Sequence, residues 1–158
     1  MNDRNRIIGQ LSATARFTDW LRLTGRVGID WYNDQFKNFN TLPDPTNTAS
    51  QYVKSNNTNK EFNADLILYF DKTFGDYSIN ANLGTAITNS RSDALAGYSG
   101  LFATPNVITL ANGLTQTVGE SYAKKEIQSA FFSASFGYKN WAYLDVTGRN
   151  DWSSTLPK

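Results

Sequence analysis

The sequence predicts an all-β fold, an antiparallel up-and-down meander of about six strands in three hairpins, of the kind that forms a membrane β-barrel wall. Three observations predict it. Apolar and polar side chains alternate with a two-residue period, the connections are alternately short and long, and aromatic residues gather where the strands end. A two-residue period gives each strand one apolar face and one polar face.

The first hairpin is predicted from two alternating segments, 7–17 and 21–31, joined by the short connection Thr18-Asp19-Trp20. Its second strand places Arg22, Arg26 and Asp30 on the polar side. In a barrel with its apolar face toward lipid, we expect these side chains to face the water-filled lumen. They could also contact an anionic or sugar ligand, but solvation of the lumen is the simpler interpretation.

The second hairpin is predicted over 61–71 and 77–88, with a turn at Thr73-Phe74-Gly75-Asp76. Its apolar set includes Phe62, Leu66 and Phe70, and Asp65 is a further candidate for the lumen. The third hairpin is predicted from about Ile127 to Tyr138, through a turn at Lys139-Asn140, and out along 142–148. Asp145 and Arg149 complete the lumen-facing candidates.

The connections between hairpins, 33–60 and 89–122, are expected to be long polar loops because proline and glycine interrupt them. Compact domains usually connect their elements with about 4–6 residues, so loops of this size need a functional reason. Outer-membrane barrels have short periplasmic turns and long extracellular loops. We therefore expect the first strand to run from the outside toward the periplasm.

Aromatic side chains flank all three short turns, where a barrel places its interfacial girdle. The expected membrane-interface residues are Phe17, Trp20, Phe74, Tyr77, Tyr138 and Trp141. The alternative is that these rings cap the core of a soluble sandwich.

Composition restricts the function. The 158 residues carry a formal charge of +1, which provides no basic footprint for nucleic acid. Histidine and cysteine are absent, so His-dependent nucleophilic catalysis and the usual zinc sites are excluded within these residues. We expect no enzyme activity, no metal and no cofactor. No signal peptide is recognisable, and we interpret the chain as a piece of an exported protein.

The run YKNWAYLDVTGRNDWSSTLP, from Tyr138 to Pro157, resembles a motif of the SusC/RagA-type TonB-dependent transporters of Bacteroidetes. The preceding strand, FFSASFGY, is similar to the strand that precedes this motif in that family. The matching positions of the motif are Tyr143, Leu144, Thr147, Arg149, Asp151, Ser153 and Ser154.

This resemblance implies that residues 1–158 are part of the wall of a large outer-membrane barrel. It also implies import of glycans or peptides energised by TonB, with a SusD-like lipoprotein as partner. The plug domain and the TonB-contacting segment of that family are not found in these residues. Six strands would moreover leave two bare edges, which cannot face lipid.

Two other interpretations stay open. A small complete outer-membrane barrel, acting as an adhesin or pore, would use the same alternation, although such barrels have at least about eight strands. A soluble ligand-binding β-barrel would turn its apolar face inward, and it should then have short loops and few charges on the other face.

Overall fold

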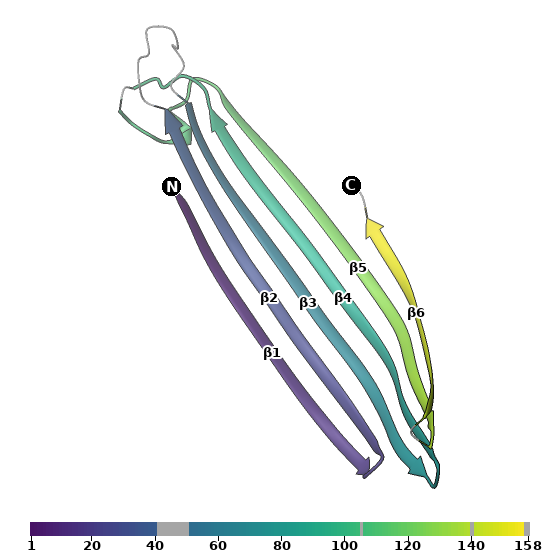
Figure 1. The fold of residues 1–158 in the computed structure, drawn as a ribbon. Coiled ribbons are helices and arrows are strands. Elements are labelled where there is room, and N and C mark those ends of the chain that lie inside the picture. The colour runs from purple at the N-terminus through teal and green to yellow at the C-terminus, as the bar shows by residue number, and fades with distance from the viewer. Residues whose placement is uncertain (41–50, 105, 140, 157–158) are drawn as a thin grey trace.

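The computed structural model describes residues 1–40, 51–104, 106–139 and 141–156, and its strands form a single curved layer (Figure 1). Its six strands are hydrogen-bonded in sequence order as one antiparallel sheet. The strands are β1 (Asn2–Thr18), β2 (Leu21–Asn40), β3 (Gln51–Phe74), β4 (Tyr77–Ser99), β5 (Gln116–Tyr138) and β6 (Ala142–Leu156). This confirms the predicted six-stranded meander, and the sheet does not close on itself.

The three short turns lie together at one end of the sheet (Figure 1). In the second turn Gly75 has a φ of 58°, which an L residue with a side chain adopts only at a cost. The second and third turns are tied together, because the backbone N–H of Lys139 donates to the carbonyl oxygen of Asp76 at 2.8 Å. The first two turns lie where they were predicted, between β1 and β2 and between β3 and β4. Of the third predicted turn, Lys139 follows the end of β5, and Asn140 lies outside the described residues.

The strands are longer than predicted, and the predicted loop bounds 33–60 and 89–122 are wrong. β2 continues to Asn40 and β3 begins at Gln51, in unbroken register. β4 likewise runs to Ser99, and β5 already begins at Gln116. The cause is that most side chains of these extensions are polar on both faces, so the regular apolar alternation that marks a strand is missing while the backbone ladder continues. Amide side chains bridge the strands instead, as where Nδ2 of Asn33 donates to Oγ1 of Thr58 at 2.8 Å.

The described part of the connection between β4 and β5 is a folded loop that contains η1 (Leu110–Asn112). The side chain of Asn112 organises it. Its Oδ1 accepts from the backbone N–H of Thr104 at 3.0 Å, and its Nδ2 donates to the carbonyl oxygen of Val107 at 2.7 Å. A backbone bridge between Phe102 and Gly113 closes the loop at its base.

The sheet has no covered core. Among the described residues only two hydrophobic side chains, Tyr52 and Ile67, are buried. Large apolar side chains remain in the open, with Leu11 76% exposed, Leu83 60% and Leu144 61%. Within the described ranges, no helix combines the length and the apolar character needed to cross a bilayer. One face of the sheet therefore exposes large apolar side chains that no other described element covers.

A polar face, an apolar belt and two depressions

Residues that pair across a β-ladder lie on the same face, so the register assigns every strand residue to one of two faces. One face, here called the polar face, holds all six side chains predicted to face a lumen: Arg22, Arg26, Asp30, Asp65, Asp145 and Arg149. The register thus brings the six candidates together on one surface. Whether this surface encloses a lumen stays a prediction.

Ion pairs cross the ladder on the polar face. Arg26 Nε lies 2.8 Å from an oxygen of Asp65, and Arg6 Nη2 lies 2.5 Å from Asp30. Arg149 donates to Asp151 on its own strand and, at 3.1 Å, to the hydroxyl of Ser129 on β5. Each of these four candidates is therefore held by partners on its own face.

Arg22 and Asp145 are arranged differently. The guanidinium of Arg22 lies 4.7 Å from the centre of the Tyr69 ring, which is within the range of a cation–π contact. Asp145 lines a depression of about 270 Å³ near the turns, whose rim also includes Arg22. These two side chains are the candidates that remain most available to a ligand or to another protein segment.

Sequence reasoning missed a cluster at the start of β1. Arg4 forms a bidentate pair with Asp34, at 2.5 and 2.7 Å, and the guanidinium of Arg4 lies 5.1 Å from the Tyr32 ring centre. Hydrogen bonds from this guanidinium lower the pKa of Asp34, so the pair persists until the pH falls below the usual range of an aspartate. The sequence could have indicated this cluster, because Arg4 and Arg6 occupy even positions, like the polar residues that follow them on β1.

The polar face also contains a depression of about 360 Å³. It is lined by Asp30, Tyr32, Asn59, Glu61 and Ser90 among others. One aromatic ring, neutral hydrogen-bonding groups and charges of both signs are gathered there. The described residues hold no group of three or more acidic, histidine or cysteine side chains that could bind a metal ion.

The opposite face, here called the outward face, carries an apolar belt that begins at the turns. The belt ends where the side chains on this face become polar: after Trp31 on β2, Phe62 on β3, Ile87 on β4 and Ala130 on β5. Trp31 pairs with Lys60, and Phe62 pairs with Asn89, so the edge of the belt moves toward the turns from strand to strand. An oblique edge is expected for strands that cross a membrane at a tilt, because ladder rows run perpendicular to the strands.

The six aromatic residues expected at a membrane interface all lie at the turn end of the belt. Tyr77 and Tyr138 pack with their ring centres 5.0 Å apart, and Tyr138 meets Trp141 edge-on at 6.4 Å. Trp20 meets Phe70 at 5.3 Å. The rings of neighbouring hairpins therefore form a band, while the interfacial role remains a prediction.

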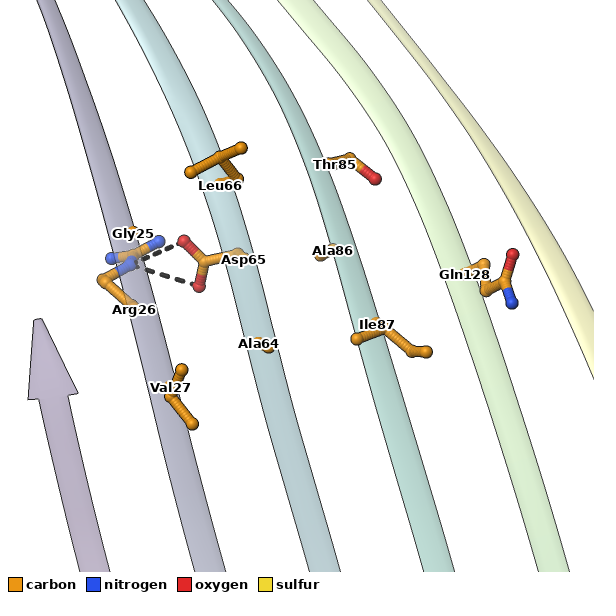
Figure 2. A pocket seen from close by; sticks show the side chains of 10 residues that line it. All are labelled: Gly25, Arg26, Val27, Ala64, Asp65, Leu66, Thr85, Ala86, Ile87 and Gln128. Carbon is orange, nitrogen blue, oxygen red and sulfur yellow. Dashed lines mark hydrogen bonds and ion pairs between the residues drawn. The ribbon is translucent and has the colours of Figure 1, made fainter.

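The belt is interrupted by an open depression of about 510 Å³ (Figure 2). Small residues, Gly25 on β2 and Ala64 on β3, lower the surface here, and Val27, Leu66 and Ile87 stand around them. The amide of Gln128 lies at the β5 side. The dashed Arg26–Asp65 pair in Figure 2 belongs to the polar face of the same strands.

Comparison with solved structures assigns this sheet to a known architecture. The chain is similar to the RagAB peptide transporter, with a TM-score of 0.80, 16% identity, and coverage of 97% of this chain and 18% of that chain. It is also similar to the RagAB peptide importer in its "open-open" state, with a TM-score of 0.78, 18% identity, and coverage of 98% and 18%. The chain thus spans less than a fifth of the length of these neighbours.

A more distant likeness is to the siderophore receptor PiuA from Acinetobacter baumannii, with a TM-score of 0.54, 9% identity, and coverage of 98% of this chain and 29% of that chain. No protein-family model and no curated protein sequence matches the chain. At these identities the likeness concerns the fold. The chain has the fold of a six-stranded section of a RagA-type transporter, as its C-terminal motif led us to expect.

Proposed function

We propose that residues 1–158 are a section of the β-barrel wall of a SusC/RagA-type TonB-dependent transporter in the outer membrane of a Bacteroidetes bacterium. One observation carries this proposal. The exposed apolar belt and the ion-paired polar face lie back to back in a single layer. Lipid on one side and water on the other would satisfy both surfaces.

The proposed transport is uptake of peptides or glycans, energised by TonB and assisted by a SusD-like lipoprotein. The RagAB neighbours are described as a peptide transporter and a peptide importer, which favours peptides. The depression around Tyr32, with charges of both signs and neutral hydrogen-bonding groups, suits a peptide backbone and its termini. The described residues would contribute wall and lumen surface to this process, and no catalysis.

A soluble barrel that binds a ligand inside its apolar face is the less favoured function. Such a barrel would cover the apolar side chains, whereas Leu11 and Leu83 are more than half exposed. It would also have to place charged groups such as Arg26 and Asp65 on its outer surface as a paired ladder. A membrane barrel accounts for both faces with the same arrangement.

The test uses two neighbouring residues of β4 that point to opposite faces, Asn82 and Leu83. Because these 158 residues contain no cysteine, a cysteine introduced at either position, Asn82→Cys or Leu83→Cys, provides a site-specific label. The variants are made in the transporter that contains the segment, with any cysteine elsewhere in it replaced. They are then labelled in intact outer membranes with a charged maleimide and with a lipid-soluble maleimide.

We expect the charged reagent to label the Asn82→Cys variant and the lipid-soluble reagent to label the Leu83→Cys variant. The reverse pattern, or equal labelling of both positions by the charged reagent, would contradict the proposed orientation. Ser92→Cys serves as the reference, because it lies on the same face as Asn82 but beyond the belt. The charged reagent should label it whichever way the belt faces.

A further inference from the structure

The outward face just beyond the belt carries a row of three cations. Lys60 on β3, Arg91 on β4 and Lys124 on β5 are successive register partners, and all three are exposed. Neighbouring strands lie about 4.8 Å apart, so the backbone positions of the three residues span only about 10 Å. Three like charges at this spacing repel each other unless an anion lies between them.

The anions of the chain neutralise this row only in part. Arg91 is paired with Asp93 at 2.8 Å, and its guanidinium lies 5.0 Å from the Tyr122 ring centre. Glu126, one row nearer the turns, accepts a hydrogen bond from Gln128 at 2.8 Å. Neither Lys60 nor Lys124 has an ion pair within the part of the chain that the structure describes, although the carboxylate of Asp93 interacts electrostatically with Lys60 as well as with Arg91.

The apolar depression of Figure 2 lies below this row on the same face. Its rim row of Val27, Ala64, Ile87 and Gln128 is two ladder rows from the cations. Two rows are four residues, or about 13 Å along a strand. Toward the turns, this face therefore presents the row of cations first and the apolar depression next. The headgroup and the acyl chains of a lipid in the outer leaflet would follow each other in the same order.

We propose that this surface binds a phosphate-bearing lipid of the outer leaflet, with its phosphate on Lys60, Arg91 and Lys124 and an acyl chain in the depression at Gly25 and Ala64. The inference rests on the proposed function, because it requires the belt to face lipid. Charge complementarity identifies the headgroup, and the apolar lining identifies the chain. A zwitterionic lipid would place its own cation against the row and is disfavoured.

The chain offers a matched control. Lys37 and Lys54 are also register partners on the outward face, but they lie three rows farther from the belt, about 20 Å along the strands. A lipid headgroup at the edge of the belt cannot reach them. The double substitution Lys37→Gln/Lys54→Gln removes the same charge as Lys60→Gln/Lys124→Gln without touching the proposed site.

The test measures lipid retention by native mass spectrometry on the purified transporter that contains this segment. It is titrated separately with lipid A, a phosphorylated glycolipid, and with phosphatidylcholine. We expect Lys60→Gln/Lys124→Gln to weaken lipid A binding about 30-fold, from the usual contribution of a basic residue near an anionic membrane surface. Lys37→Gln/Lys54→Gln should bind lipid A as the unchanged protein does, and binding of phosphatidylcholine should be the same in all three.

A second pair of variants tests the acyl-chain half of the site. Ala64→Leu fills the depression, while Ala81→Leu adds the same bulk on the same face nearer the turns. We expect the former alone to reduce lipid A retention. Inorganic phosphate at millimolar concentration should not displace the lipid, and displacement would assign the row to free phosphate instead.

Besides displacement by inorganic phosphate, three results would overturn the proposal: equal lipid A binding by the two lysine variants, equal loss of phosphatidylcholine, or equal effects of the two leucine substitutions. Failure of the proposed function has a different signature. The transporter would then not insert into membranes at all, and it would lack the shift in gel mobility on heating that folded barrels show. Failure to insert would overturn both proposals. Normal insertion with lipid A binding that none of the substitutions changes would overturn only the lipid proposal.

Discussion

Arg26 of β2 and Asp65 of β3 are direct partners in the ladder, and Nε of Arg26 donates to both carboxylate oxygens, at 2.8 and 3.2 Å. The pair lies directly behind the depression of the apolar face (Figure 2). A charge pair and an apolar depression thus lie on opposite sides of the same two strands.

The first prediction concerns this pair. Arg26→Ala should lower the heating temperature at which the folded barrel band disappears from a gel, because Asp65 loses its partner. The decrease should be small, since both side chains are partly exposed to water. The reversed pair, Arg26→Asp/Asp65→Arg, should restore the temperature, and a reversed pair no better than the single variant would show that the contact is incidental.

The second prediction compares the two faces at one level of β4. Leu83→Arg places a charge near the middle of the belt and should lower the free energy of unfolding in lipid vesicles by about 2–4 kcal/mol. Asn82→Arg, on the polar face, should change it much less. Denaturant unfolding followed by tryptophan fluorescence measures both. Similar losses for the two variants would mean that the belt does not contact lipid.

The third prediction concerns a glycine covered by a ring. A Cβ on Gly84 would overlap the ring of its register partner Phe131, so Gly84→Ala must displace the ring. Gly28 lies on the same polar face and offers a matched control, because a Cβ there would come no closer than 3.8 Å to another residue. We expect Gly84→Ala to cost about 1–3 kcal/mol of unfolding free energy and Gly28→Ala to cost less. Equal costs in the same unfolding assay would exclude ring displacement as the cause.

The fourth prediction addresses the connection between β4 and β5. Ser99 and Gln116 are register partners, so residues 101–114 can be replaced by a two-residue Asn-Gly turn without breaking the ladder. We expect uptake of peptide or glycan by the transporter to fall while membrane insertion is unchanged. Unaltered uptake would remove this loop from ligand capture.

A milder variant tests whether uptake depends on the folded shape of this loop or only on its presence. Asn112→Ala removes the side-chain hydrogen bonds to Thr104 and Val107 but keeps the chain length. Uptake by this variant should lie between that of the unchanged protein and that of the deletion. Uptake equal to that of the deletion would assign the whole effect to the folded shape.

The strands, their faces and the short turns were predictable because apolar and polar residues alternate along each strand. This alternation shows which side of the sheet each residue faces. Arg26 and Asp65 could be placed on one side from the sequence alone. Their pairing could not, because it depends on the register between residues 39 positions apart. The same holds for the row of Lys60, Arg91 and Lys124, whose members are distant in sequence and become neighbours only in the assembled sheet.

Strand ends were unpredictable for a different reason. Alternation reports the contrast between an apolar and a polar face, and this contrast ends where the belt ends. Beyond Trp31 and Phe62 both faces carry mostly polar side chains, so the sequence of a strand there resembles that of a polar loop. The candidate site was underestimated accordingly, since Arg4, Asp34 and Asn59 lie within or beside these extensions.

The length of β3 has a consequence for how a ligand would approach. A tilted strand needs about 9–11 residues to cross the hydrocarbon of a bilayer, and β3 has 24. If the segment spans an outer membrane as proposed, more than half of β3 would stand outside the bilayer core. A ligand approaching from that side would then move along the polar face of these strands before it reaches the level of the lipids.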